Sequence, residues 1–206
     1  MIEEDRVEQR LRAAGTEEIA GGPPDLECAA RAAGLLDVAY ATHETPVGRL
    51  LLAATPGGLV RVAYLDGEPD ELLAQLARRI SSRVLAAPRA LAEPRRQLDE
   101  YFAGRRRSFD APVDWRLIRG FTRRVLEVTA AIPYGSVATY KGVAQQAGSP
   151  RGSRAAGNAL GANPLPIVVP CHRVLASGGG LGGYTGGLER KLALLAVEGV
   201  QVALRR

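Results

Sequence analysis

The chain has 206 residues, of which 46% are hydrophobic and 24% are charged. This composition supports a packed core and excludes wholesale disorder, and the length suits one large domain or two small ones. No apolar run is long enough to span a membrane, the acidic start is unlike a signal peptide, and the two distant cysteines form no disulfide framework. We therefore expect a soluble protein of the reducing cytoplasm with no membrane partner. We also expect a monomer.

The net charge of +5 is distributed unevenly along the chain. Residues 1–37 carry nine acidic and four basic side chains, residues 38–114 carry ten and eleven, and residues 115–206 carry three and twelve. The last part is therefore a basic module, which suits binding to the phosphate backbone of nucleic acids. The alternative is that the excess charge only keeps the protein soluble.

Residues 1–37 have the composition of an appendage. Two short helices are predicted, over 3–15 and 25–36, and the helix-breaking sequence GGPP separates them. The acidic charge of this extension contrasts with the basic last third, which motivates the hypothesis that the extension folds over the basic face.

The pattern of apolar and polar residues over 38–114 predicts a small α/β domain. Strands are expected over 37–42, 48–55 and 58–65, with turns at TPVG and TPGG between them. Apolar residues at helical spacing predict helices over 69–80 and 91–104. Residues 105–115 read as a linker to a second domain.

Residues 115–206 begin with a helix over 117–132 that stops before Pro133. Thr139 is placed to cap a helix over 140–147, and Ser149-Pro150 to open the next one, which gives a helix-turn-helix pattern. The second helix, RGSRAAGNALGAN, is almost entirely small residues apart from its two arginines. Small side chains permit either close approach to DNA or tight packing against another helix, and the surrounding positive charge favours DNA.

The next segments lead to a cysteine and a histidine, two residue types that are rare in this chain. The apolar run LPIVVP predicts a buried strand over 165–170, and Cys171 and His172 follow at its end. A glycine-rich loop over 177–187 lacks the spacing of a phosphate-binding loop. A helix over 188–199, closed by Gly199, completes the pattern.

Two charged residues of that last helix fall within its apolar stripe. At about 100° per residue, Lys191 and Glu198 lie on the side of the leucines, and they are about 10 Å apart along the axis. Each needs a partner elsewhere because an isolated buried charge is unfavourable. His172 is the expected partner of Glu198. The alternative is that both charges reach solvent at the edge of the stripe.

Cys171, His172 and Glu198 supply the residue types of a nucleophile, a base and a residue that orients the base. Neighbouring side chains on an extended segment point to opposite faces, so we expect a bridging water rather than a direct bond between Cys171 and His172. A buried structural cysteine is the alternative. Zinc fits poorly, because the chain has only two cysteines and two histidines. We expect no metal site and no cofactor.

At this point two stretches carry a resemblance to a known family. GNALGANPLPIVVPCHRV and LGGYTGGLERKLALLAVEG resemble the O6-alkylguanine-DNA alkyltransferases, strongly over 116–200 and more weakly over 38–114. The resemblance implies a ribonuclease-H-like α/β N-terminal domain over 38–114 and a mostly α C-terminal domain with a winged-helix-like helix-turn-helix over 115–206. Residues 1–37 resemble nothing in the family.

The resemblance also implies an activity, which is single-turnover transfer of an alkyl group from O6-alkylguanine in double-stranded DNA to Cys171 after base flipping. His172, Glu198 and a water would ionise Cys171. Tyr140 would rotate a phosphate, Arg154 would fill the gap left by the flipped nucleotide, and Asn163 would brace the turn before the active-site strand. The implied DNA- and substrate-binding residues are Tyr140, Arg154, Asn163, Arg173, Val174, Tyr184, Thr185 and Lys191.

Three other functions remain to be weighed. A non-enzymatic protein that binds alkylated bases is the main alternative, although Cys171 argues against it. A transcriptional regulator is disfavoured by the absence of a ligand domain or dimer motif. A cysteine hydrolase usually brings a distant histidine to the thiol, and the only other one here is His43.

Overall fold

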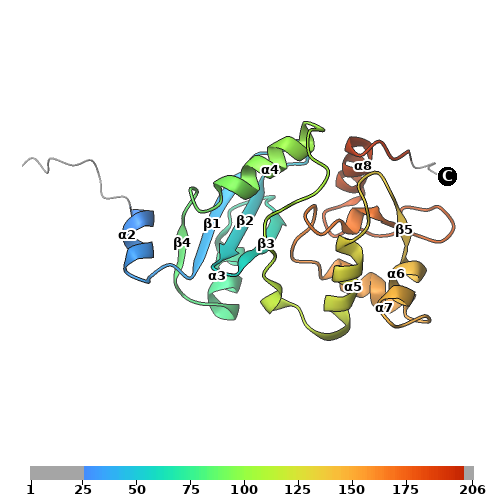
Figure 1. Ribbon diagram of the computed structural model, residues 1–206, viewed down its shortest axis with the longest axis horizontal. Coiled ribbons are helices and arrows are strands. Elements are labelled where there is room, and N and C mark those ends of the chain that lie inside the picture. Colours follow the sequence, from blue (N-terminus) through green and yellow to red (C-terminus); the bar gives the residue numbers. More distant parts are fainter. Residues whose placement is uncertain (1–25, 202–206) are drawn as a thin grey trace, which may run out of the picture.

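The computed structural model describes residues 26–201. A sheet with its helices forms one side of the molecule, and a cluster of helices α5 to α8 forms the other, with an extended connection running between them (Figure 1). The predicted helix over 3–15 lies outside the described residues. No helix within 26–201 combines the length and apolar character needed to cross a membrane.

The described residues of the first side form a four-stranded sheet of order β3-β2-β1-β4. β1, β2 and β3 pair antiparallel and β4 pairs parallel with β1. The three predicted strands are confirmed, and β4 was missed. The strands are β1 (Val38–His43), β2 (Leu50–Thr55), β3 (Gly58–Tyr64) and β4 (Val84–Ala86).

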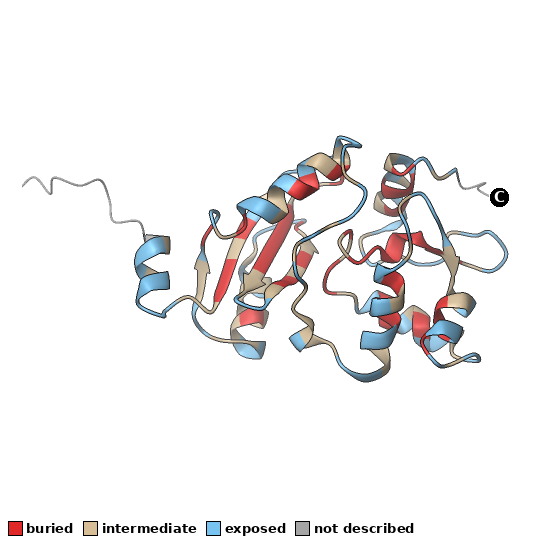
Figure 2. Ribbon diagram, viewed as in Figure 1, coloured by how far each residue is buried: buried red, intermediate tan, exposed pale blue. Residues whose placement is uncertain are grey.

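Both faces of this sheet are covered, which explains the unbroken apolar run of β2. Leu50 and Leu52 pack with Leu98 of helix α4 (Ala92–Phe102), whereas Leu51 pairs with the cluster that contains Leu76 of helix α3 (Asp70–Arg79). Side chains alternate between faces along a strand, so consecutive leucines are buried on opposite sides. Figure 2 shows the resulting buried band through the sheet and along the inner sides of the helices.

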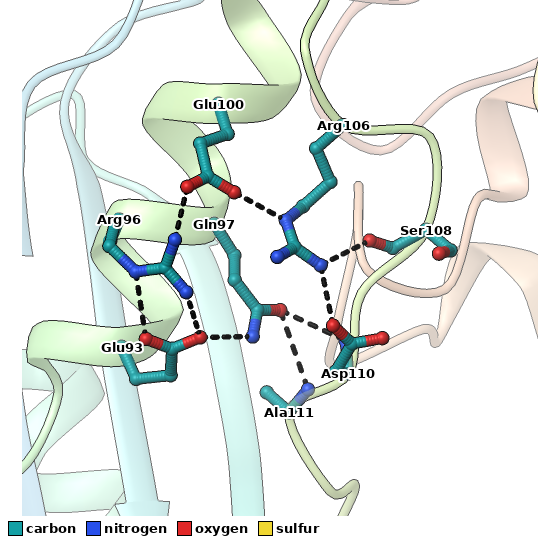
Figure 3. Close-up of polar contacts among 8 residues, drawn as sticks. All are labelled: Glu93, Arg96, Gln97, Glu100, Arg106, Ser108, Asp110 and Ala111. Carbon is teal, nitrogen blue, oxygen red and sulfur yellow. Dashed lines mark hydrogen bonds and ion pairs between the residues drawn. The ribbon is translucent and has the colours of Figure 1, made fainter.

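The connection from the sheet to the second side is anchored, rather than being a free linker. Arg106 pairs with Glu100 at 2.8 Å and with Asp110 at 2.7 Å, and the backbone N–H of Asp110 donates to Gln97 at 2.9 Å (Figure 3). A bridge between Leu59 and Val113 continues the attachment to β3. These contacts fix the path of the chain into the second side.

The extension begins the described chain with helix α2 (Leu26–Ala32), at the end of the molecule away from α6 and α7 (Figure 1). The carboxylate of Glu27 accepts from the backbone N–H groups of Arg89 and Ala90, at 3.1 and 2.8 Å. The hypothesis of a fold over the basic face is therefore wrong for residues 26–32, since backbone donors of the sheet domain hold the helix there.

The second side is mostly helical, as expected. A small parallel pair of strands, β5 (Ala138–Thr139) and β6 (Val174–Leu175), ties the helix pair to the segment after Cys171. Thr139 caps α6 as predicted, because its side chain accepts from the N–H of Gly142 at 3.0 Å. The helices are α5 (Gly120–Ala130), α6 (Tyr140–Gln146), α7 (Ser153–Gly161) and α8 (Leu188–Val197).

Two local predictions on this side are wrong. α7 begins at Ser153, not at Ser149-Pro150, because residues 149–152 form the turn between the helices, with the Gly152 N–H donating to the Ser149 carbonyl at 2.8 Å. Residues 165–170 are mostly buried but form no strand. Ile167 has a φ of 74° and the Val169 N–H donates back to Leu165 at 2.8 Å. Prolines within and around this run remove the donors that a strand needs.

Candidate active site around Cys171

Cys171 opens a 3-10 turn, η2 (Cys171–Arg173), and its side chain is almost completely buried. The side-chain amide of Asn163 donates to the sulfur at 3.1 Å and to the Val169 carbonyl at 2.9 Å, while its oxygen accepts from the Leu165 N–H at 3.0 Å. Asn163 therefore contacts both the segment before Cys171 and the sulfur itself, and the contact with the sulfur was not indicated by the sequence.

Burial raises the pKa of the Cys171 thiol, although the hydrogen bond from Asn163 and the charge of Lys191 act in the opposite direction. The resting group is therefore a thiol, and it needs a base before it can act as a strong nucleophile.

His172 is fully buried and its Nε2 lies 2.8 Å from Oε1 of Glu198, which is the predicted partner. Its other ring nitrogen, Nδ1, has no hydrogen-bond partner within residues 26–201. The expected absence of a direct Cys171–His172 bond agrees with the described contacts, but the reason given was wrong, because both residues lie in a 3-10 turn rather than a strand. An unpaired buried nitrogen usually indicates a place for a water or a ligand group.

Glu198 receives hydrogen bonds from several parts of the chain. Besides His172, the phenol of Tyr101 donates at 2.8 Å and the backbone N–H of Gly135 at 3.1 Å. Burial by itself would raise the pKa of Glu198, but the hydrogen bonds from His172 and Arg173 outweigh it and lower the pKa to about 2. The carboxylate is therefore ionised at neutral pH.

Arg173 was predicted to bind DNA or substrate, and the structure contradicts this. Its side chain is buried, with Nε 2.9 Å from Oε2 of Glu198 and Nη2 2.9 Å from Oε1. Nη1 donates to the carbonyl of Ile132. A guanidinium fully engaged inside the protein is not available to a ligand, so Arg173 is a partner of Glu198 instead.

Lys191 is fully buried, which rules out the alternative that it reaches solvent. Its ammonium group donates to the carbonyls of Val174 at 2.7 Å, Leu181 at 2.5 Å and Gly183 at 3.4 Å. Burial lowers the pKa of Lys191 to about 8. Lys191 therefore ties the glycine-rich loop to α8, and the carbonyl of Val174, one of the implied binding residues, already accepts one hydrogen bond.

A cavity of about 500 Å³ opens beside Cys171, between α6, α7 and the glycine-rich loop. Four of the predicted binding residues line it together with the thiol. The small residues of α7 leave room there, and the phenol of Tyr140 donates to the Gly183 carbonyl at 3.2 Å across the cavity. The lining residues are Tyr140, Arg154, Gly157, Asn158, Leu160, Gly161, Cys171, Gly183, Tyr184 and Thr185.

Two side chains of the sheet domain contact the site and were not predicted from the sequence. Tyr101 of α4 reaches Glu198, and Tyr64 of β3 lies with its hydroxyl 2.8 Å from that of Tyr184. Tyr101 follows Leu98 at helical spacing, so its burial was predictable. Its partner 97 residues away was not. No group of three or more His, Cys, Asp or Glu side chains among the described residues is arranged to hold a metal ion.

Comparison with known proteins gives a consistent result for both sides of the molecule. Residues 38–115 match the ribonuclease-like domain of 6-O-methylguanine DNA methyltransferase, and residues 120–200 match its DNA-binding domain. The chain belongs to the 6-O-methylguanine DNA methyltransferase family. The expected fold class, a ribonuclease-like domain followed by a helical DNA-binding domain, is thereby confirmed.

Individual members of the 6-O-methylguanine DNA methyltransferase family are similar over most of the chain. The methylated-DNA–protein-cysteine methyltransferase of Mycolicibacterium paratuberculosis is 41% identical over 78% of this chain and 92% of its own length. That of Methanosarcina acetivorans is 37% identical over 78% of this chain and 97% of its own. A crystal structure of Mycobacterium tuberculosis OGT in complex with DNA is 38% identical, with a TM-score of 0.67, and the match covers 78% of this chain and 93% of that one.

Proposed function

We propose that this chain repairs DNA by transferring an alkyl group directly from O6 of guanine in double-stranded DNA to Sγ of Cys171, once per molecule. The observation that carries the proposal is the position of the thiol on the wall of the cavity beside α6 and α7, next in sequence to His172, which pairs with the buried Glu198. The names of the relatives and the DNA complex of the similar structure support the same activity.

Access to the thiol requires the damaged nucleotide to leave the duplex, which costs a few kcal/mol of stacking and pairing. In the proposal, Arg154 occupies the gap that the nucleotide leaves, and Tyr140 contacts the backbone beside it. Both line the mouth of the cavity and α7 carries small residues there, which supports docking of this helix close to the DNA. Tyr184 and Thr185 then enclose the flipped base.

The chemistry begins at the unpaired Nδ1 of His172. A water between this nitrogen and Cys171 accepts the thiol proton and passes it to His172, while Glu198 stabilises the imidazolium. The sulfur attacks the alkyl carbon in line, the C–O6 bond breaks, and the proton returns to the leaving guanine. The thioether does not hydrolyse, so the protein is used once.

We extend the proposal to the organisation of the chain. Residues 38–114 and 115–206 form the two domains and residues 1–37 an extension, which the family matches over 38–115 and 120–200 support. We propose a monomer acting in the cytoplasm, because the site is completed by residues of a single chain.

The alternative, a non-enzymatic protein that binds alkylated bases, is not favoured, because the relatives are named as methyltransferases. One experiment tests the choice. Duplex DNA containing O6-methylguanine is incubated with the protein, and the peptide that contains Cys171 is weighed. We expect the mass of one methyl group in place of one hydrogen, absent in Cys171→Ala. Tight binding with no mass change would support the alternative.

A further inference from the structure

The side chain of Tyr184 lines the cavity that receives the flipped base in the proposed function, hereafter the base cavity. Contacts within the helical side fix the backbone around this residue. The carbonyl of Gly183 accepts from Tyr140 at 3.2 Å and from Lys191 at 3.4 Å, and the N–H of Gly187 donates to the Tyr184 carbonyl at 3.0 Å. None of these contacts involves the phenol of Tyr184, so the position of its ring is set by other groups.

The phenol of Tyr184 contacts the sheet domain. Its hydroxyl lies 2.8 Å from that of Tyr64, and it makes no other polar contact within residues 26–201. The two rings pack edge to face, with centroids 6.3 Å apart and planes at 68°. Tyr64 is the last residue of β3, the strand of the sheet nearest the helical side (Figure 1). The N–H of Val62 on the same strand donates to the Pro164 carbonyl at 2.8 Å, so β3 is itself attached to the helical side.

Tyr64 has a well-defined position because Arg190 of α8 packs on its ring. The guanidinium carbon lies 4.5 Å from the ring centroid, which is a cation–π contact. The same guanidinium donates to the Val47 carbonyl at 3.0 Å and pairs with Asp66 at 2.5 Å, both in the sheet domain. A Cβ added at Gly186 would overlap the rings of both tyrosines, so the loop packs closely against them. Tyr64 is therefore a fixed point to which the Tyr184 ring is attached.

Packing alone does not hold the Tyr184 ring in place. A second cavity, of about 210 Å³, also borders Tyr184, and Tyr64 lines this cavity but not the base cavity. A side chain beside an empty space has no packing partners on that side. The hydrogen bond to Tyr64 is therefore the contact that keeps the ring from moving into the second cavity and away from the base.

We propose that Tyr64 is a positioning residue for alkyl transfer: it holds the Tyr184 ring against the flipped base and so keeps the reacting carbon in line with the sulfur of Cys171. The inference rests on the proposed function. Tyr64 does not line the base cavity, so it acts through Tyr184. An in-line displacement depends steeply on alignment, and a misplacement of about 1 Å is enough to slow such a reaction strongly. The sheet domain thereby contributes to the rate of a reaction whose nucleophile lies in the other domain.

The test follows single-turnover methyl transfer from duplex DNA containing O6-methylguanine, with the protein in excess. The dependence of the rate on protein concentration gives a half-saturating concentration, which reports DNA binding, and a limiting rate, which reports alignment in the complex. Tyr64→Phe keeps the ring and removes the hydroxyl. We expect its limiting rate to fall about fivefold, the size of one hydrogen bond, with an unchanged half-saturating concentration. Unfolded protein would lower the amplitude and not the rate. Tyr40→Phe, which removes a hydroxyl from β1, should keep the wild-type limiting rate.

A double-mutant cycle determines whether Tyr64 acts through Tyr184. If it does, the variant that combines Tyr64→Phe with Tyr184→Phe should be no slower than Tyr184→Phe alone. Effects that multiply would show independent roles and overturn the proposal. So would an unchanged limiting rate in Tyr64→Phe, or a reduced rate with a shifted pH profile, which would assign the hydroxyl to the ionisation of Cys171. Absence of methyl transfer by the wild-type protein would instead reject the proposed function.

Discussion

At the scale of single residues, Glu198 is the most heavily engaged group of the site. Its carboxylate accepts from Tyr101, His172, Arg173 and Gly135. Arg173 already balances its charge, so His172 can stay neutral until the thiol proton arrives. Burial is the largest influence on His172 and lowers its pKa, against the opposing effect of Glu198. The histidine is thereby kept as an available base.

Tyr101 of the sheet domain is placed to influence the pKa of His172. Its hydroxyl and Nε2 of His172 share the oxygen Oε1 of Glu198. In Tyr101→Phe that oxygen loses a donor and stabilises the imidazolium more strongly, so the pKa of His172 should rise. We expect the pH profile of the single-turnover rate to shift upward, with a loss of folding stability of about 1 kcal/mol. Tyr40→Phe, a tyrosine of β1, is the control, and an unshifted profile in Tyr101→Phe would mean that the hydroxyl is only structural.

The ionised state of Glu198 also predicts a pH dependence of stability. Its pKa is about 2 in the folded protein and near the ordinary 4.5 when unfolded. The stabilisation is therefore complete above pH 4.5 and is lost as the pH falls toward 2. Urea unfolding at pH 5 and pH 3 should give a larger decrease for the wild-type protein than for Glu198→Gln. Equal decreases would show that this carboxylate does not contribute.

At the scale of elements, the regular spacing of apolar residues predicted most of the strands and helices. The strands of the β1–β3 meander and the helices α3 to α8 follow from alternation, apolar spacing and stop signals. β4 was missed because three residues are too few for a periodic pattern. The segment over 165–170 was misjudged because an apolar run is equally compatible with a strand and with a buried turn, and only the neighbouring helices decide.

The candidate site was predictable to the extent that its residues are close in sequence or on one helix face. Cys171 and His172 are adjacent, and the helical wheel placed Glu198 toward the core. Tyr64 and Tyr101 could not be assigned, since their contacts depend on how the two domains pack. Arg173 was misassigned for a different reason, because its partner Glu198 lies 25 residues further along the same domain and the sequence assigned that carboxylate to His172 alone.

The junction of sheet and connection gives a prediction at this scale. Gly58 has a φ of 122°, and a Cβ there would lie 2.2 Å from the Pro112 carbonyl oxygen. Gly58→Ala should lower the free energy of unfolding by about 1–3 kcal/mol or more, through strain and displacement of the connection. Gly67→Ala is the control, as nothing lies within 4 Å of its added Cβ. Urea midpoints of the two variants should differ clearly, and equal midpoints would contradict the packing at Pro112.

At the scale of the whole molecule, DNA binding and chemistry can be separated experimentally. Arg154 lines the cavity mouth, whereas Arg151 precedes α7 and does not line it. Arg154→Ala should slow repair of O6-methylguanine in a duplex by about 10-fold or more, because flipping loses a partner, but should leave reaction with the free base unchanged. Arg151→Ala should slow neither reaction at low salt. If Arg154→Ala slowed both substrates equally, its role would lie in the chemistry instead.

Helix α8 and Glu198, the residue that caps its C-terminal end, hold two parts of the site at a fixed spacing. Lys191 holds the loop around the base cavity, and Glu198 holds His172. The two residues are seven positions apart, so the rotation about the helix axis between them is within about 20° of two complete turns. One residue inserted between them would rotate Glu198 by about 100° and separate the proton relay from the loop. The length of α8 therefore does not tolerate insertions or deletions. A chimera between members of this family would have to exchange the Cys171–Arg173 turn and α8 together as a single unit.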